Sequence, residues 1–278
     1  MSTNTPTPEE NRTQDSPLVL AVGNQKGGCG KTTTALNVGG ALSKSGYDVL
    51  LIDLDPQGHL SEDCGLGNEY DADGMSLHDI LSDLSKQDQI NEIIRSHDEF
   101  DIVPAHAQMF QTESELTSAI RREERLQLAL AELNKEYEFI LIDCPPNLGA
   151  LTNNAFLAAE HILLPARPTS KSIKAIELLM HQKSALENGY STNIDIVGVV
   201  GNEVSYDNES KEMMDWFEET FESIAPIFAV RSRVALQRAA DNSGSIFAYS
   251  VDCDMEAEYL RIAESLVDEA WQEGRTDA

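Results

Sequence analysis

The residues with the clearest chemical meaning lie near the N-terminus, where glycines are interleaved with lysines and threonines. They form the run Lys26-Gly27-Gly28-Cys29-Gly30-Lys31-Thr32-Thr33. Glycine takes positive φ without steric cost, so a loop of this composition can turn successive backbone N–H groups inward and form an anion nest that opens into a helix N-terminus. The run therefore predicts a loop that binds the phosphates of a nucleotide.

The spacing within this loop assigns a role to each polar residue. Lys31 would reach the β- and γ-phosphates and supply positive charge there, the Thr32 hydroxyl would ligate Mg²⁺, and Thr33 would reach the α-phosphate. The residues expected at the nucleotide are consecutive: Gly27, Gly28, Cys29, Gly30, Lys31, Thr32 and Thr33. A chance glycine-rich turn is the alternative interpretation. An apolar strand predicted over 18–22 and a helix predicted over 34–43 favour the phosphate loop.

Carboxylates follow two further apolar runs of the chain. Asp53 and Asp55 come at the end of one run, and Asp143 ends the other. In an open parallel sheet, ligands bind beyond the carboxyl ends of the strands, so these side chains would lie at the same edge as the phosphate loop. Each aspartate could instead be a turn residue that ends its strand. Their order along the chain, after a phosphate loop, favours a shared nucleotide site.

A second lysine in the loop, Lys26, has no use in an ordinary nucleotide pocket. With this lysine the chain resembles the deviant Walker-A ATPases of the ParA/MinD group, and among them the ParA/Soj-type partition ATPases. The segment 49–58, VLLIDLDPQG, is similar to the group's second nucleotide motif, and 139–147, FILIDCPPN, is similar to its Walker-B strand and switch. The stretch 165–171 departs from the group's pattern, which leaves the role of that loop open.

This resemblance implies an ATP-dependent homodimer in which Lys26 crosses to the nucleotide of the partner subunit. It also implies slow, Mg²⁺-dependent ATP hydrolysis that a partner protein stimulates. Asp55 would position the attacking water, with Asp53 beside it near Mg²⁺ or as the alternative for that role, and Asp143 would hold Mg²⁺ through a water. Asn202 corresponds to an asparagine that binds the adenine edge in the group, although it could be a turn residue.

The apolar pattern alternates between strands and helices from Pro17 onward. Further strands are expected at 100–104, 161–165, 194–202 and 225–230, and further helices at 112–133, 170–188, 210–221 and 255–271. Such alternation predicts an α/β fold, with a doubly wound, mostly parallel sheet flanked by helices. Residues 1–16 are polar and lack apolar periodicity, so we expect a disordered tail followed by a single domain over 17–278.

An excess of acidic residues sets the chain apart. It has 48 Asp and Glu against 20 Lys and Arg, which gives a formal net charge of −28. High ionic strength would screen the self-repulsion of such a fold, so we predict a halophilic source. No stretch approaches the roughly 18 continuous apolar residues of a membrane span. Four cysteines without Cys-x-x-Cys spacing predict reduced thiols in a cytoplasmic protein.

Two segments are locally basic against this acidic background. Arg231, Arg233 and Arg238 lie in the acid-free stretch 223–240, and Lys171 and Lys174 lie in the acid-free stretch 161–176. These residues would contact the phosphate backbone of DNA, which gives nonspecific binding without base readout. They could alternatively pair with neighbouring carboxylates or line the nucleotide site.

Several functions compatible with the same fold remain as alternatives. The ParA resemblance implies plasmid or chromosome partitioning on the nucleoid, with a ParB-like centromere-binding activator. A MinD-like positioning ATPase, acting on a membrane or protein cargo, would need a basic amphipathic C-terminal helix, whereas residues 255–278 carry seven acidic residues and two arginines. An iron–sulfur carrier would need paired cysteines, which Cys64 and Cys253 do not provide. A nucleotide sensor without hydrolysis is disfavoured by the complete set of carboxylates.

Overall fold

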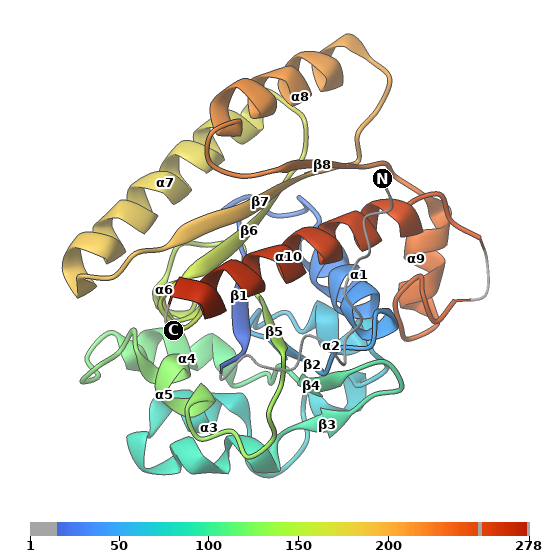
Figure 1. The fold of residues 1–278 in the computed structure, drawn as a ribbon. Helices are drawn as coiled ribbons and strands as arrows, with labels where there is room; N and C mark the ends of the chain where they lie inside the picture. Colours follow the sequence, from blue (N-terminus) through green and yellow to red (C-terminus); the bar gives the residue numbers. More distant parts are fainter. Residues whose placement is uncertain (1–15, 250–251, 277–278) are drawn as a thin grey trace.

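The computed structural model describes residues 16–249 and 252–276, so all but the last residue of the predicted tail 1–16 lies outside the described residues. Within the described part, eight strands form one sheet in the order β3-β4-β2-β5-β1-β6-β7-β8 (Figure 1). Their bounds are β1 Leu18–Val22, β2 Val49–Asp53, β3 Arg95–Ser96, β4 Asp101–Val103, β5 Phe139–Asp143, β6 His161–Ala166, β7 Asp195–Asn202 and β8 Ile227–Val230.

The sheet is parallel except at one edge, where β3 runs antiparallel to β4. This confirms the predicted doubly wound α/β architecture. In the register of the three central strands, Asp143 at the end of β5 pairs with Val22 of β1 on one side and with Asp53 of β2 on the other. The start of the phosphate loop and two predicted site carboxylates therefore lie on adjacent strands at the same edge.

Helices cover both faces of this sheet (Figure 1). Their bounds are α1 Lys31–Lys44, α2 His59–Asp63, α3 Leu77–Ser82, α4 Met109–Leu116, α5 Arg125–Leu130, α6 Ala150–Ala159, α7 Lys171–Tyr190, α8 Asn208–Phe221, α9 Val234–Asp241 and α10 Glu256–Thr276, with 3₁₀ turns η1 Gly67–Glu69 and η2 Leu84–Glu92. None of the described helices is long and apolar enough to cross a membrane.

The core consists of two apolar layers, one on each face of the sheet. Successive residues of β2 alternate between them: Leu50 and Ile52 pack in one layer, and Val49 and Leu51 pack in the other. This alternation follows from the two-residue period of a strand. Apolar residues of α3 to α8 complete the first layer, and those of α1, α2, α9 and α10 complete the second.

The prediction of a single helix over 112–133 is wrong. The structure has two short helices there, α4 and α5, joined by turns in which Arg121 takes the left-handed conformation with φ of 52°. Asn154 of α6 replaces the missing helical hydrogen bonds. Its Oδ1 accepts from the Leu126 N–H at 3.0 Å, and its Nδ2 donates to the Arg122 carbonyl at 2.8 Å. A tertiary contact therefore overrides the local helical preference.

Candidate nucleotide-binding site

The loop between β1 and α1, residues 23–30, has the backbone that its glycines predict. Gly28 and Gly30 have φ of 68° and 87°, in the left-handed region that favours glycine. Gly30 also lacks room for a side chain, since a Cβ there would lie 2.6 Å from Asn202 Nδ2. The loop leads directly into α1, whose first N–H groups have no acceptor within the helix. This arrangement suits the binding of a phosphate.

The two lysines of the loop have different environments. Lys31 is 7% exposed, and its Nζ lies 3.5 Å from the carbonyl oxygen of Lys26. Lys26 is half-buried, and its Nζ donates hydrogen bonds to Thr169 Oγ1 at 3.2 Å and Ser172 Oγ at 3.5 Å. The single chain thus holds Lys26 against the start of its own α7. Thr169 lies in the loop 165–171, for which the sequence suggested no role.

Asp143 reaches the start of α1 from the end of β5. Thr32 Oγ1 donates a hydrogen bond to Asp143 Oδ2 at 2.7 Å, whereas Oδ1 is buried without a hydrogen-bond partner in the described part of the chain. Burial, together with the nearby charge of Asp53, raises the pKa of Asp143 well above its usual value. A buried carboxylate oxygen without a donor, beside a threonine hydroxyl, fits Mg²⁺, which prefers oxygen ligands and keeps several waters.

Asp53, which pairs in register with Asp143, is held by Ser61. The Ser61 backbone N–H and hydroxyl both donate to Asp53 Oδ2, at 2.8 and 2.7 Å. Asp53 is fully buried, and this burial raises its pKa to about 7 although the Ser61 hydrogen bonds act in the opposite direction. The Asp55 N–H also donates to Asp53 Oδ1, at 3.3 Å. Because both of its oxygens have donors within the protein, Asp53 is less available to ligate Mg²⁺ than Asp143 is.

Asp55 lies in a braced turn just beyond β2. Its Oδ1 accepts a hydrogen bond from the Gln57 N–H at 3.0 Å, and Gly58 closes the turn with φ of 69°. Tyr70 supports the turn from outside: its hydroxyl donates to the Pro56 carbonyl at 2.7 Å, and a Cβ at Gly58 would lie 2.8 Å from the Tyr70 ring. Asp55 is 8% exposed, so its carboxylate is largely enclosed at the edge of the sheet.

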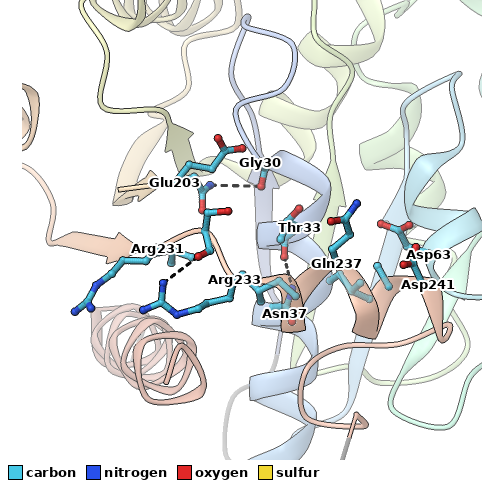
Figure 2. Close-up of a pocket in the computed structure, with 15 residues that line it drawn as sticks. Gly30, Thr33, Asn37, Asp63, Glu203, Arg231, Arg233, Gln237 and Asp241 are labelled. Atoms are coloured by element: carbon cyan, nitrogen blue, oxygen red, sulfur yellow. Dashed lines mark hydrogen bonds between the residues drawn. The ribbon is translucent and has the colours of Figure 1, made fainter. Parts of the chain in front are cut away.

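A cavity of about 460 Å³ adjoins the phosphate loop (Figure 2). It is lined by Gly30, Thr33, Leu36, Asn37, Asp63, Asn202, Glu203, Val230, Arg231, Ser232, Arg233, Leu236, Gln237, Ala240 and Asp241. At the end of β7, Asn202 Nδ2 donates to the Cys29 carbonyl and to Thr34 Oγ1, both at 3.0 Å. Because Nδ2 is engaged in this way, a further hydrogen bond to the Asn202 amide would be accepted by its Oδ1.

The two ends of this cavity differ in charge. Asp63 and Asp241 lie together at one end, while the side chains of Arg231 and Arg233, at the other end, point away from Gly30 and Thr33 (Figure 2). Burial raises the pKa of Asp63 to about 6, and the charge of Asp241 contributes in the same direction. The arginines therefore line the cavity with their stems rather than with their charges.

The predicted DNA contacts fall into two separate places, α9 with the segment before it and the start of α7. Arg233 forms a bidentate ion pair with Asp254, with distances of 2.6 and 2.5 Å. Arg231 donates to the Tyr206 hydroxyl at 2.7 Å and stacks on its ring. The remaining three residues are exposed: Arg238, Lys171 and Lys174. Arg233 therefore pairs with a carboxylate, which is the alternative to DNA contact that the sequence left open.

The cysteines are free thiols, and those of the nucleotide motifs are buried. Cys29 is 1% exposed and Cys144 is fully buried. Burial raises the pKa of both thiols, so they are protonated at neutral pH and behave as small apolar residues.

Comparisons with known proteins identify the family of this chain. The AAA domain family matches residues 18–196. The chain is 32% identical to the chromosome-partitioning ATPase Soj of Treponema pallidum, over 88% of this chain and 94% of that protein. It is 31% identical to the chromosome partitioning protein ParA of Caulobacter vibrioides, over 90% of this chain and 93% of that protein.

A solved structure shows the same fold with a nucleotide bound. Cobyrinic acid a,c-diamide synthase from Mycobacterium smegmatis, crystallised with an ATP analog and magnesium, is 27% identical to this chain. It superposes with a TM-score of 0.74 over 93% of this chain and 97% of its own. From the matched domain, the extent of the two relatives and the shared fold, the chain belongs to the ParA/Soj family of P-loop ATPases.

Proposed function

We propose that the chain is a Mg²⁺-dependent ATPase that dimerises with ATP, binds DNA nonspecifically, and partitions a plasmid or chromosome in the cytoplasm, on the nucleoid. The observation that carries the nucleotide chemistry is the Thr32–Asp143 pair. Asp143 Oδ1, which is buried and has no hydrogen-bond partner among the described residues, lies beside a glycine-rich loop, and a cavity large enough for a nucleoside adjoins that loop.

The residues of the site divide the work of phosphoryl transfer. When bound, Mg²⁺ would neutralise charge on the outer phosphates. Thr32 would hold it directly and Asp143 through a water, while the Lys31 ammonium adds positive charge at the β- and γ-phosphates. Asp55, fixed in its turn by the Gln57 N–H, would orient the attacking water toward the γ-phosphate. Such positioning is the main contribution a protein makes to this reaction.

Dimerisation would release Lys26 from its own chain. Its partners there, Thr169 and Ser172, are neutral hydroxyls at 3.2 and 3.5 Å. Both distances lie at or beyond the usual limit for a hydrogen bond, so each bond is weak although its donor is charged. A triphosphate on a partner subunit would offset that loss because its oxygens are negatively charged, so the bonds that Lys26 makes to them would also be ion pairs. This difference supports Lys26 as a residue that senses ATP across a dimer interface.

DNA binding and partitioning are supported by the relatives that partition chromosomes and by the exposed cations of the chain. With about four phosphate contacts, a tenfold rise in salt would weaken binding by roughly 10³ to 10⁴. An ATP dimer doubles these contacts, which is a physical reason to couple DNA binding to the nucleotide. A ParB-like activator would then stimulate turnover, and an arginine supplied in trans is worth roughly 10³ to 10⁵ in rate.

Binding of a random-sequence duplex tests the DNA proposal. It is measured in multimolar KCl with ATP and Mg²⁺, with ADP, and without nucleotide. We expect the duplex to bind only in the presence of ATP and Mg²⁺. This binding should be lost in the double variant Arg231→Ala/Arg238→Ala. Arg121→Ala is the control because Arg121 is exposed and pairs with Glu124 in the distant turn before α5. No binding in any state would favour the MinD-like alternative, which ATP-dependent sedimentation with anionic vesicles then tests.

Phosphate release tests the catalytic assignments. Lys31→Ala should abolish nucleotide binding. Asp55→Ala should bind ATP and form a dimer that persists, because the group that orients the water is missing. Dimer lifetime is followed by size-exclusion chromatography with ATP and Mg²⁺. Normal turnover in Asp55→Ala would show that another residue positions the water.

A further inference from the structure

Glu113 of α4 contacts the segment that follows Asp143, residues 144–149, which we name the switch loop. Its Oε2 accepts a hydrogen bond from Asn147 Nδ2 at 3.1 Å. Its Oε1 accepts from the backbone N–H of Ala150, the first residue of α6, at 3.0 Å. One half-buried carboxylate therefore holds both the middle of the switch loop and the helix at its end.

The start of α6 depends on this carboxylate because its own sequence provides no cap. The N-cap residue is Gly149, and the first turn of α6 contains no acidic residue. The first N–H groups of a helix have no acceptor within it, and negative charge is favourable at that end. Glu113 supplies both the acceptor and the charge, although it lies 37 residues earlier in the chain.

Gly149 leaves the space that the Glu113 carboxylate fills. A Cβ at this position would lie 1.4 Å from Oε1 and 2.6 Å from the carboxyl carbon. The backbone of Gly149, with φ of −95° and ψ of −167°, is extended and open to alanine. Alanine at 149 would thus displace the carboxylate without straining its own backbone.

The switch loop lies against the phosphate loop, so its position bears on the reaction. A side chain at Gly27 would reach the switch loop, since a Cβ there would be 3.8 Å from Pro146 Cβ, so the two loops are neighbours. The switch loop also begins directly after Asp143, the carboxylate that faces Thr32. The helix that carries Glu113 is held in place, because Met109, Thr112 and Leu116 of α4 are buried in the core.

We propose that Glu113 is a positioning residue for ATP hydrolysis: its carboxylate fixes the switch loop over the phosphate loop and thereby sets Asp143 for the reaction. The inference rests on the proposed ATPase function. The carboxylate of Glu113 accepts hydrogen bonds from the switch loop and from α6 rather than from the phosphate loop, so its loss should slow turnover more than it weakens nucleotide binding.

The test compares Glu113→Ala, Gly149→Ala and the double variant with wild type. We expect kcat to fall about 10-fold in each single variant, since misplacement by 1 Å can cost about 100-fold. The Kd of a fluorescent ADP with Mg²⁺ should change less than about 2-fold. The double variant should be no slower than either single one, because both substitutions remove the same contact. Glu113→Gln, which keeps an oxygen for the Ala150 N–H, should recover most of the rate.

Glu115→Ala is the matched control, since Glu115 is on the same helix but accepts from Ser82 of α3. Amide hydrogen exchange of residues 144–155, measured without nucleotide, reads the contact independently of hydrolysis and should rise in both single variants. The positioning role would be overturned if kcat of the double variant fell by the product of the two single-variant losses. It would also be overturned if kcat stayed unchanged while amide exchange became faster. An inactive wild type would defeat the ATPase proposal instead, and unchanged exchange in Glu113→Ala would defeat the contact itself.

Discussion

Replacing Asp53 with asparagine should flatten the pH dependence of stability between pH 5 and pH 8. Burial raises the pKa of Asp53 from its usual 3.8 to about 7 in the folded protein. Between these two values the folded chain holds a proton that the unfolded chain has released. Raising the pH through 7 therefore removes stability from the folded state.

The size of this effect follows from the two pKa values. Each unit of difference corresponds to about 1.4 kcal/mol, so the loss between pH 5 and pH 8 is about 3 kcal/mol. For a chain of this length, that loss lowers the melting temperature by roughly 6 to 12 °C. Asp143 should act in the same direction, since burial and the charge of Asp53 raise its pKa as well.

The assay is thermal unfolding at constant high KCl, with EDTA present so that no divalent cation binds the carboxylates. The melting temperature of wild type should fall as the pH rises, while that of Asp53→Asn should change little because asparagine does not titrate. The variant should still fold, since the amide oxygen can accept the hydrogen bonds from Ser61. Asp88→Asn, at an exposed site on η2, is the control for removal of one negative charge. A constant gap between wild type and Asp53→Asn from pH 5 to pH 8 would refute the reasoning.

Three further substitutions test other parts of the site. Lys26→Ala should leave the Kd for ADP within about 2-fold, because in the single chain Lys26 makes only long hydrogen bonds to Thr169 and Ser172. It should abolish the ATP-dependent dimer in size-exclusion chromatography, because the dimer needs the charge of Lys26 at the partner's nucleotide. Asn202→Ala loses hydrogen bonds to the phosphate loop of about 1 kcal/mol each, so calorimetry should show ADP binding weakened about 10-fold, and unchanged affinity would speak against it. Tyr70→Phe removes the hydrogen bond to Pro56 and should lower the free energy of unfolding by about 1 kcal/mol, measured in urea.

The parts of the fold that the sequence predicts best are those with local causes. Strands β1, β2 and β5 are short apolar runs buried almost throughout, and their period and flanking residues are visible in the chain. The aspartates at their ends were predictable for the same reason, because parallel strands bring their carboxyl ends to one edge. Local sequence failed at 112–133, where hydrogen bonds from Asn154 divide the expected helix.

The residues that support the site left no comparable signal. Ser61 follows Asp53 by eight residues, and Tyr70 reaches Pro56 across fourteen. Glu113 contacts Ala150 across 37 residues, and Lys26 contacts Thr169 across 143. Each contact depends on the packing of elements that periodicity alone does not place. Gly149 is the one sequence feature that hints at the Glu113 contact, since a glycine at the start of a helix leaves room for a side chain from another part of the chain.

The pairing of Asp143 with Val22 and Asp53 on adjacent strands has a consequence for how this protein can diverge. Neighbouring strands are held about 4.8 Å apart by main-chain hydrogen bonds, whatever side chains they carry. The separation of the two carboxylates from the origin of the phosphate loop is therefore inherited from the peptide backbone. Apolar residues in either layer can be exchanged over evolutionary time at a cost in stability, while the spacing that the chemistry needs is preserved.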